Sequence, residues 1–361
     1  MDNYLKFIVV FISSVVLCFL LSKIVIALAH RFGILDYPKS ARKIHSRPTP
    51  LLGGLAVYFT LLVMTLILWQ KGYLFDPRIE PSNVAWFMLS GLILMLNGYL
   101  DDKYDIKPYV SIWGPILASL AVIIGGLKIA YITNPGGGVL YLDRFFDSWP
   151  GGGELIIFIL TFLWLLGITY TTKLLDGIDG LATSIGFISS LVIFVVSLSW
   201  DVVGSTTSLL AISLAGALLG FLFVNWHPAK IFLGEGGSTF IGFSLGVLAI
   251  ISGSKIVTAL LVMGLPLLDI FWVIVRRLKQ KKAWYQGDNE HLHFRLLRAG
   301  FSQRQVVGFF ASVSLVFGLV SIFFTTKTKI GALLILLAVM FFLSTWLNYK
   351  LKKMESNQTY D

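Results

Sequence analysis

The chain has 361 residues, of which 56% are hydrophobic and only 13% are charged, and its mean hydropathy is +0.82. These values exclude an ordinary water-soluble protein and a disordered chain, and they indicate an integral membrane protein. One cysteine cannot form an internal disulfide, which excludes a disulfide scaffold. The formal net charge of +10 would suit nucleic-acid binding, so the positions of the basic residues must decide its meaning.

Apolar runs recur along almost the whole chain, and most have the roughly 17 to 25 residues that a helix needs to cross a bilayer. We therefore predict an all-α, polytopic integral membrane helical bundle of ten or eleven transmembrane helices, forming a single membrane-embedded domain over residues 1–361. The eleven runs are 5–29, 51–70, 83–100, 109–127, 154–172, 181–200, 208–225, 237–252, 256–275, 305–325 and 330–348.

The lysines and arginines between these runs are unevenly distributed. If the connecting segments alternate between the two sides of the membrane, 20 of these basic residues lie on one side and eight on the other. The positive-inside rule assigns the richer side to the cytoplasm, so we predict a multi-pass cell-membrane protein whose N-terminus is outside and whose C-terminus is cytoplasmic. The positive charge then reflects topology and contact with anionic headgroups, and we expect no nucleic-acid partner.

Acidic residues gather on this same side, where the positive-inside rule does not require them. The first group, in the sequence DDKYD, contains Asp101, Asp102 and Asp105, which share or neighbour one helix face if the preceding helix continues. Three carboxylates so close together suit a divalent cation, since Mg²⁺ prefers hard oxygen ligands. The alternative is a solvated helix end with Lys103 and Lys107 as partners.

Two further acidic groups contain glycines, which let a ligand approach the backbone closely. Asp176 and Asp179 lie in DGIDG, which suits a nucleotide or metal site but is also typical of a turn between two helices. Glu235 lies in GEGGS before a helix whose N-terminus favours anions such as phosphate. Nearby, Asn225 and Phe232 could bind and stack on a base, or could be a helix cap and a membrane anchor.

The fourth group contains His291 and His293, in a strongly basic loop. Imidazoles there could contact phosphate, lie exposed in the loop or bind a metal. Asp269 stands apart, about 10 Å into the membrane by helical rise, just after Pro266, which we expect to bend the span. An intramembrane acid is functional or paired, so Asp269 either faces the site or forms a structural pair.

These motifs, in this order, resemble those of the polyprenyl-phosphate N-acetylhexosamine-1-phosphate transferases (glycosyltransferase family 4). That family includes GlcNAc-1-phosphate transferases and phospho-MurNAc-pentapeptide transferases. The resemblance covers almost the whole chain and lies in RKIHSRPTPLLGG at 42–54, DDKYD, DGIDGLA, FLGEGGS and EHLHFRLL.

The resemblance implies transfer of a sugar 1-phosphate from a UDP-sugar to a polyprenyl phosphate in the membrane, with release of UMP, at a cytoplasmic site that requires Mg²⁺ (or Mn²⁺). It is also compatible with a homodimer. By matching positions, the resemblance implies catalytic roles for Asp101 and Asp102, metal binding by Glu235, Asp101 and Asp176, nucleotide binding by Asp176, Asp179, Asn225 and Phe232, and phosphate or sugar binding by Lys173, His291, His293, His45 and Arg295.

The chain also departs from the family pattern. Lys173 stands where an Asn precedes DGIDG, Glu235 replaces an Asp, Phe294 stands where another His is common, and Leu51 takes a position that is often basic. These changes would mark either altered phosphate contacts or lost activity. Lys173 lies three residues before Asp176, so the two would share a helix face, and Lys173 could form an ion pair with Asp176 or reach a phosphate oxygen.

Other interpretations remain open at this stage. EHLHFRLL and the C-terminal span favour the GlcNAc branch over the phospho-MurNAc-pentapeptide branch. A membrane transporter would need polar residues at mid-membrane depth, where we find only Asp269, Lys23 and Asn97. An intramembrane prenyltransferase would need paired DxxxD motifs, and a CDP-alcohol phosphotransferase would need further Asp residues soon after DGIDG, neither of which is present.

Overall fold

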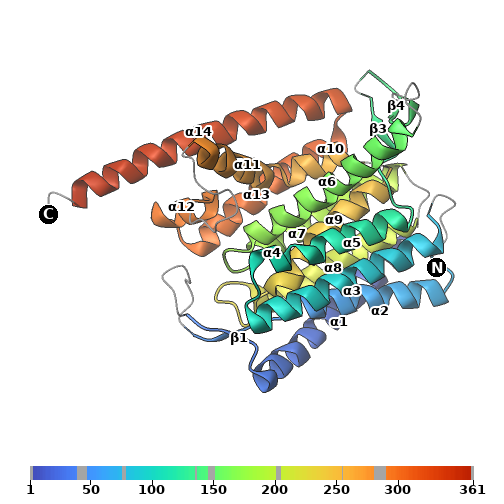
Figure 1. Cartoon of the computed structure of the whole chain (residues 1–361), viewed down its shortest axis with the longest axis horizontal. Coiled ribbons are helices and arrows are strands. Elements are labelled where there is room, and N and C mark those ends of the chain that lie inside the picture. The colour runs from blue at the N-terminus through green and yellow to red at the C-terminus, as the bar shows by residue number, and fades with distance from the viewer. Residues whose placement is uncertain are drawn as a thin grey trace.

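The computed structural model describes residues 3–38, 47–74, 79–134, 136–144, 151–200, 205–253, 255–279 and 290–358. These residues form a helical bundle with two very short antiparallel ribbons in the connections, β1–β2 and β3–β4 (Figure 1). The first half consists of α1 (Asn3–Phe32), β1 (Leu35–Asp36), β2 (Thr49–Pro50), α2 (Gly53–Gln70), α3 (Pro81–Tyr104), α4 (Pro108–Ser111), α5 (Trp113–Ile124), β3 (Tyr131–Thr133), β4 (Val139–Tyr141) and α6 (Gly152–Leu175). The second half consists of α7 (Leu181–Trp200), α8 (Thr206–Asn225), α9 (Gly234–Ile251), α10 (Ile256–Val262), α11 (Gly264–Lys279), α12 (Leu292–Arg298), α13 (Gln303–Phe323) and α14 (Thr326–Gln358).

Within these described residues, nine helices are long and apolar enough to cross a membrane, and α10 with α11 makes a tenth, bent by 78°. The predicted all-helical membrane fold is therefore confirmed. The remaining predicted run, 109–127, forms the shorter apolar segment α4–α5. The bend precedes Pro266, which lies in the first turn of α11, where a missing N–H costs no helical hydrogen bond.

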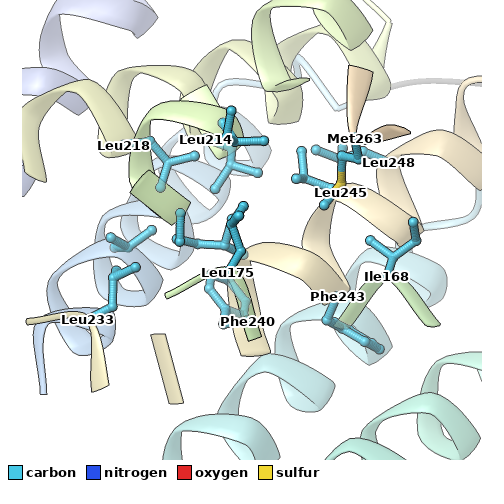
Figure 2. Packing of buried hydrophobic residues seen from close by; sticks show 14 of the residues in the cluster. Ile168, Leu175, Leu214, Leu218, Leu233, Phe240, Phe243, Leu245, Leu248 and Met263 are labelled. Atoms are coloured by element: carbon cyan, nitrogen blue, oxygen red, sulfur yellow. The ribbon is translucent and has the colours of Figure 1, made fainter. Parts of the chain in front are cut away.

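The apolar pattern of each helix matches its place in the bundle. The most apolar stretch of α9 is 89% buried and that of α8 is 83% buried, whereas those of α1 and α14 are each 28% buried. Helix α9 contacts α2, α3 and α6, and its Phe240 and Phe243 belong to the same buried cluster as Ile168 and Leu175 of α6 (Figure 2). An outer helix can remain apolar all round because lipid covers its exposed face.

The two ends of the bundle contain different termini and different connecting segments. The C-terminus, β1 and α12 lie at one end, and the N-terminus and the β3–β4 ribbon lie at the other (Figure 1). We call the first the motif end, because contacts described below bring DDKYD, DGIDG and GEGGS together there. The two termini therefore lie at opposite ends of the bundle (Figure 1).

Candidate active site

A cavity of about 780 Å³ opens at the motif end, between the ends of α3, α6 and α8 and the start of α9. Its volume lies in the range of small-molecule sites, roughly 300 to 1,000 Å³. Eight of the residues predicted for the site line this cavity: Asp101, Asp102, Lys173, Asp176, Asp179, Asn225, Phe232 and Glu235.

The DDKYD motif forms the last turn of α3. The helix continues through Asp101 and Asp102 but ends at Tyr104, so Asp105 does not share the predicted helix face with Asp101. Asp105 then adopts a left-handed conformation with φ of 49°, and its N–H donates to the carbonyl of Asp101 at 2.8 Å. Asp101 and Asp102 are therefore held on a regular helix, and chain reversal begins only after them.

Glu235 lies in the first turn of α9, and three groups hold it. Its backbone N–H donates to Oδ1 of Asp102 at 3.0 Å. Its Oε1 accepts a hydrogen bond from Ser111 Oγ at 3.3 Å and lies 2.5 Å from Nζ of Lys173. The third acidic motif is thus joined to the first through Asp102 and to α6 through Lys173.

The position of this turn depends on glycines in two neighbouring helices. A Cβ on Gly54 of α2 would overlap the backbone of Gly237, and a Cβ on Gly98 of α3 would overlap the backbone of Gly236. Both helices therefore approach the start of α9 at backbone distance, as small residues allow between membrane helices.

Lys173 does not form the ion pair with Asp176 that was one of its two predicted contacts, and its predicted contact with phosphate stays a prediction. Helix α6 ends at Leu175, and Asp176 turns away with ψ of 46°, so the two side chains do not share a helix face. Lys173 instead reaches across to Glu235 on α9. The two motif residues that depart from the family pattern at these positions are therefore in direct contact.

The DGIDG segment carries two carboxylates in different surroundings. Burial, together with the nearby carboxylates of Glu235 and Asp179, raises the pKa of Asp176 to about 7. Asp179 Oδ2 accepts the N–H of Ala229 at 3.1 Å and lies 2.6 Å from Nδ1 of His227. Asp179 therefore fixes the connection between α8 and α9.

Asn225 and Phe232 belong to the same connection. The Asn225 side chain accepts a hydrogen bond from Thr183 at 2.7 Å and donates to the carbonyl of Ile231 at 2.9 Å. The backbone of Phe232 bonds to Pro50 and Gly53, each at 2.9 Å. Asn225 thus closes the loop internally, and Phe232 is held at the cavity by the segment before α2.

The predicted histidine loop lies beside the cavity lining rather than in it. Asp269 Oδ2 lies 2.9 Å from Nδ1 of His291, and Asp269 Oδ1 accepts the N–H of Leu292 at 2.9 Å. Asp269 therefore forms a structural pair, one of the two outcomes expected. His293 stacks on His291 with ring centroids 5.7 Å apart, and a Cβ on Gly177 would lie 2.5 Å from its Nε2.

Arg295, also in α12, is buried and points to α14. Its guanidinium donates to Oγ and the carbonyl of Ser344 at 3.2 and 3.0 Å and to Asn348 at 2.8 Å.

Phosphate contact by His291, His293 and Arg295 stays a prediction, and His45 lies outside the described residues. The other two departures lie near the site, since Leu51 lines the cavity and Phe294 packs on the ring of His293 at 4.2 Å.

Sequence reasoning missed three partners of the site. Ser111 bonds to Glu235, His227 lies against Asp179, and Gln303 accepts the N–H of Asp179 at 3.3 Å. These residues lie outside the acidic motifs, and no spacing in the sequence points to them. Their proximity arises from the way the helices cross.

The donor atoms at this cavity suit a hard divalent cation. Asp101, Asp176 and Glu235 supply carboxylate oxygens, the ligands that Mg²⁺ prefers. Among the described residues, however, no group of three or more acidic, His or Cys side chains is arranged to hold a metal ion. The ammonium of Lys173 lies against one of these carboxylates, on Glu235.

Comparison with known proteins identifies the family of the chain. A model of glycosyl transferase family 4 matches residues 84–253. The chain is 32% identical over 327 residues to a probable undecaprenyl-phosphate N-acetylglucosaminyl 1-phosphate transferase of Bacillus subtilis, covering 87% of this chain and 85% of the relative. The chain belongs to glycosyl transferase family 4. It is thus a multi-pass membrane member of that family.

Two further relatives of this family 4 chain carry related names. A decaprenyl-phosphate N-acetylglucosaminephosphotransferase of Mycolicibacterium smegmatis is 32% identical over 305 residues, covering 78% of this chain and 72% of the relative. An undecaprenyl-phosphate alpha-N-acetylglucosaminyl 1-phosphate transferase of Escherichia coli K12 is 26% identical over 291 residues, covering 77% and 72%. The family 4 match contains DDKYD, DGIDG and GEGGS and ends before the histidine loop.

Proposed function

We propose that this chain transfers N-acetylglucosamine 1-phosphate from UDP-GlcNAc to a polyprenyl phosphate and releases UMP. The observation that carries the proposal is the convergence of Asp101, Asp102, Asp176 and Glu235, from three separate motifs, on one cavity at the end of a membrane bundle. Such a cavity can take a water-soluble nucleotide sugar from one side and a lipid headgroup from the bilayer. The names of the relatives support GlcNAc over the phospho-MurNAc-pentapeptide alternative.

The chemistry follows from the charges of the two substrates. A phosphate monoester has a second pKa of about 6, so the lipid phosphate is largely dianionic at pH 7 and can attack directly. Its oxygen forms a bond to the β-phosphorus of UDP-GlcNAc while the bond from that phosphorus to the bridging oxygen breaks, and UMP leaves. Asp102, at the end of α3, is the residue we assign to accept any proton left on the lipid phosphate.

The other polar residues of the cavity position the substrates. We assign the uracil base to Phe232, whose ring can stack on it, within a loop that Asp179 and Asn225 hold in shape. Asp101, Asp176 and Glu235 are the residues that would hold Mg²⁺ (or Mn²⁺), which when bound supplies positive charge against the phosphates. His291, His293, His45, Lys173 and Arg295 remain the candidates for phosphate or sugar contact.

We also propose that the motif end faces the cytoplasm. The end of α11 carries Arg276, Arg277 and Lys279, and the end of α14 carries Lys350, Lys352 and Lys353. This basic excess agrees with the positive-inside rule. A cytoplasmic cavity would meet UDP-GlcNAc where nucleotide sugars are made.

The structure does not favour a transporter. Each of the three residues that the sequence places at mid-membrane depth has a partner of its own: Asp269 pairs with His291, Asn97 donates to the carbonyl of Ser111 at 3.1 Å, and Lys23 lies over the ring of Phe19 at 4.5 Å. An ion pathway would need such groups to face one continuous polar route.

The test uses the purified full-length protein with Mg²⁺, polyprenyl phosphate and one UDP-sugar at a time, and measures UMP. We expect UMP release with UDP-GlcNAc that requires the lipid, and little or none with UDP-glucose or UDP-MurNAc-pentapeptide. Release of UDP instead of UMP, or UMP release that does not need the lipid phosphate, would overturn the proposed reaction.

A further inference from the structure

One basic side chain lies inside the acidic cluster and contacts a carboxylate that we assign to the metal. Lys173 Nζ is 2.5 Å from Glu235 Oε1, and the two side chains are 26% and 12% exposed. Ser111 Oγ donates to the same oxygen. This oxygen of Glu235 is therefore already occupied by one charged and one neutral donor.

The surrounding charges explain why an ammonium is stable at this place. The carboxylate of Glu235 lies within electrostatic range of Asp101, Asp102 and Asp176. Four carboxylates so close together repel one another, and a single fixed positive charge relieves part of that repulsion. Lys103, which also lines the cavity, donates instead to the hydroxyl of Tyr99 at 3.0 Å.

We propose that Lys173 is a tethered cation that competes with the divalent ion for Glu235, so that metal binding displaces the Lys173 ammonium and Lys173 sets the metal affinity of the site. This inference rests on the proposed function, which places Mg²⁺ at the cluster. A carboxylate oxygen that holds an ammonium at 2.5 Å is not free to coordinate Mg²⁺ at about 2.0 to 2.1 Å. The two cations also repel each other.

The side chain of Lys173 is suited to such movement. Lysine carries its charge on a flexible four-carbon stem, so the ammonium can leave Glu235 without a change in α6. The ring of Tyr170, three residues earlier on the same helix, already lies 5.5 Å from Nζ, so an aromatic face stays beside the ammonium when it leaves Glu235. Releasing Lys173 therefore requires only a change of rotamer.

The competition also accounts for two departures from the family pattern at once. Glu235 and Lys173 form an ion pair, so each side chain partly neutralises the charge of the other. A neutral residue at 173 would leave Glu235 without its ammonium and open to the metal. The two departures are then coupled, because together they place an ion pair in the site, and they need not mean that the site has lost its activity.

The experiment measures metal binding directly, without the transfer reaction. Purified full-length protein is titrated with Mn²⁺, and free Mn²⁺ is followed by electron paramagnetic resonance, with Mg²⁺ as competitor. We expect Lys173→Asn and Lys173→Gln to bind Mn²⁺ about tenfold more tightly than the unaltered protein, and Lys173→Arg to bind no more tightly. Lys103→Asn is the matched control, since it removes the same charge from the same cavity, and we expect it to change the affinity less than twofold.

A second readout follows Lys173 in the unaltered protein. Addition of Mg²⁺ should increase the labelling of Lys173 by an amine-reactive reagent several-fold, measured by mass spectrometry, while the labelling of Lys103 stays constant. This readout does not depend on any variant being folded.

Three results would overturn the inference. Equal Mn²⁺ affinity in the Lys173→Asn variant and the unaltered protein would show that no competition occurs. An equal gain in Lys103→Asn would show a general charge effect. Absence of Mn²⁺ binding in every variant would contradict both this inference and the metal site assigned in the proposed function. The first result, if accompanied by UMP release, would contradict this inference and leave the proposed function intact.

Discussion

The carboxylate of Asp102, in the last turn of α3, accepts the backbone N–H of Glu235, in the first turn of α9, at 3.0 Å. The N–H groups of a first helical turn have no partner within their own helix, and an anion there is also favoured by the helix dipole. Asp102 therefore accepts, from another helix, a hydrogen bond that an N-cap side chain normally accepts at the start of its own helix. The same contact joins two acidic motifs that are more than a hundred residues apart in sequence.

Asp102 should have a structural role and a chemical role that can be separated. In Asp102→Asn the side-chain oxygen can still accept the N–H of Glu235, so we expect the thermal midpoint to stay nearly unchanged while UMP release falls about 10²-fold or more. Asp102→Ala leaves that N–H without its acceptor and should also lose about 1 to 3 kcal/mol of stability. Full activity in Asp102→Asn would mean that another group accepts the proton.

The close approach of α3 to α9 predicts a strong effect of one methyl group. A Cβ at Gly98 would overlap the backbone of Gly236, so Gly98→Ala should displace the start of α9, cost about 1 to 3 kcal/mol and lower activity. Gly167→Ala in α6 is the control, because its Cβ would meet nothing within 4 Å, and alanine there should be neutral or stabilising by about 0.5 to 1 kcal/mol. Similar thermal midpoints for the two variants would contradict this view of the packing.

Sequence patterns were sufficient for most of the spans and for the grouping of the three acidic motifs. Hydropathy locates membrane helices well because the bilayer leaves few other structures for an apolar run. The partners of individual side chains could not be predicted in the same way. Lys173 pairs with Glu235 rather than Asp176, and Asp269 with His291, because helix ends and crossing positions decide which side chains meet.

Arg295 tests whether the histidine loop contacts substrate or only supports the bundle. Its guanidinium joins α12 to Ser344 and Asn348 of α14 through three hydrogen bonds. Lysine cannot reproduce this forked contact, so Arg295→Lys should lower the thermal midpoint, with a loss of about 1 to 3 kcal/mol. If Arg295 serves only the bundle, KM for UDP-GlcNAc stays unchanged. A raised KM with an unchanged midpoint would instead support the predicted phosphate contact.

His293 should make stability depend on pH. Burial, with a smaller effect of His291, lowers the pKa of His293 to about 3, and neither of its ring nitrogens has a hydrogen-bond partner among the described residues. The folded state therefore keeps this ring neutral, while the unfolded chain takes up a proton below pH about 6.5. Stability should fall as pH drops below 6.5, by about 1.4 kcal/mol at pH 5.5.

The measurement compares thermal midpoints of the unaltered protein and His293→Gln between pH 7.5 and 5.5. Glutamine does not titrate, so the variant should lose less stability over this range, whatever its midpoint at pH 7.5. An identical pH dependence in both proteins would show that His293 does not contribute to it.

The orientation of the bundle can be tested with single cysteines, because the one natural cysteine, Cys18, is fully buried and should label poorly. Lys128→Cys lies after α5, near the end that carries the N-terminus, and Lys353→Cys lies near the end of α14, at the motif end; both positions are exposed. With the basic residues of the motif end in the cytoplasm, an impermeant maleimide added to intact cells should label Lys128→Cys and spare Lys353→Cys. After the cells are permeabilised, both should be labelled, which controls for reactivity. Labelling of Lys353→Cys alone in intact cells would show that the bundle has the opposite orientation. The cavity would then face away from the cytoplasmic pool of nucleotide sugar that the proposed reaction needs.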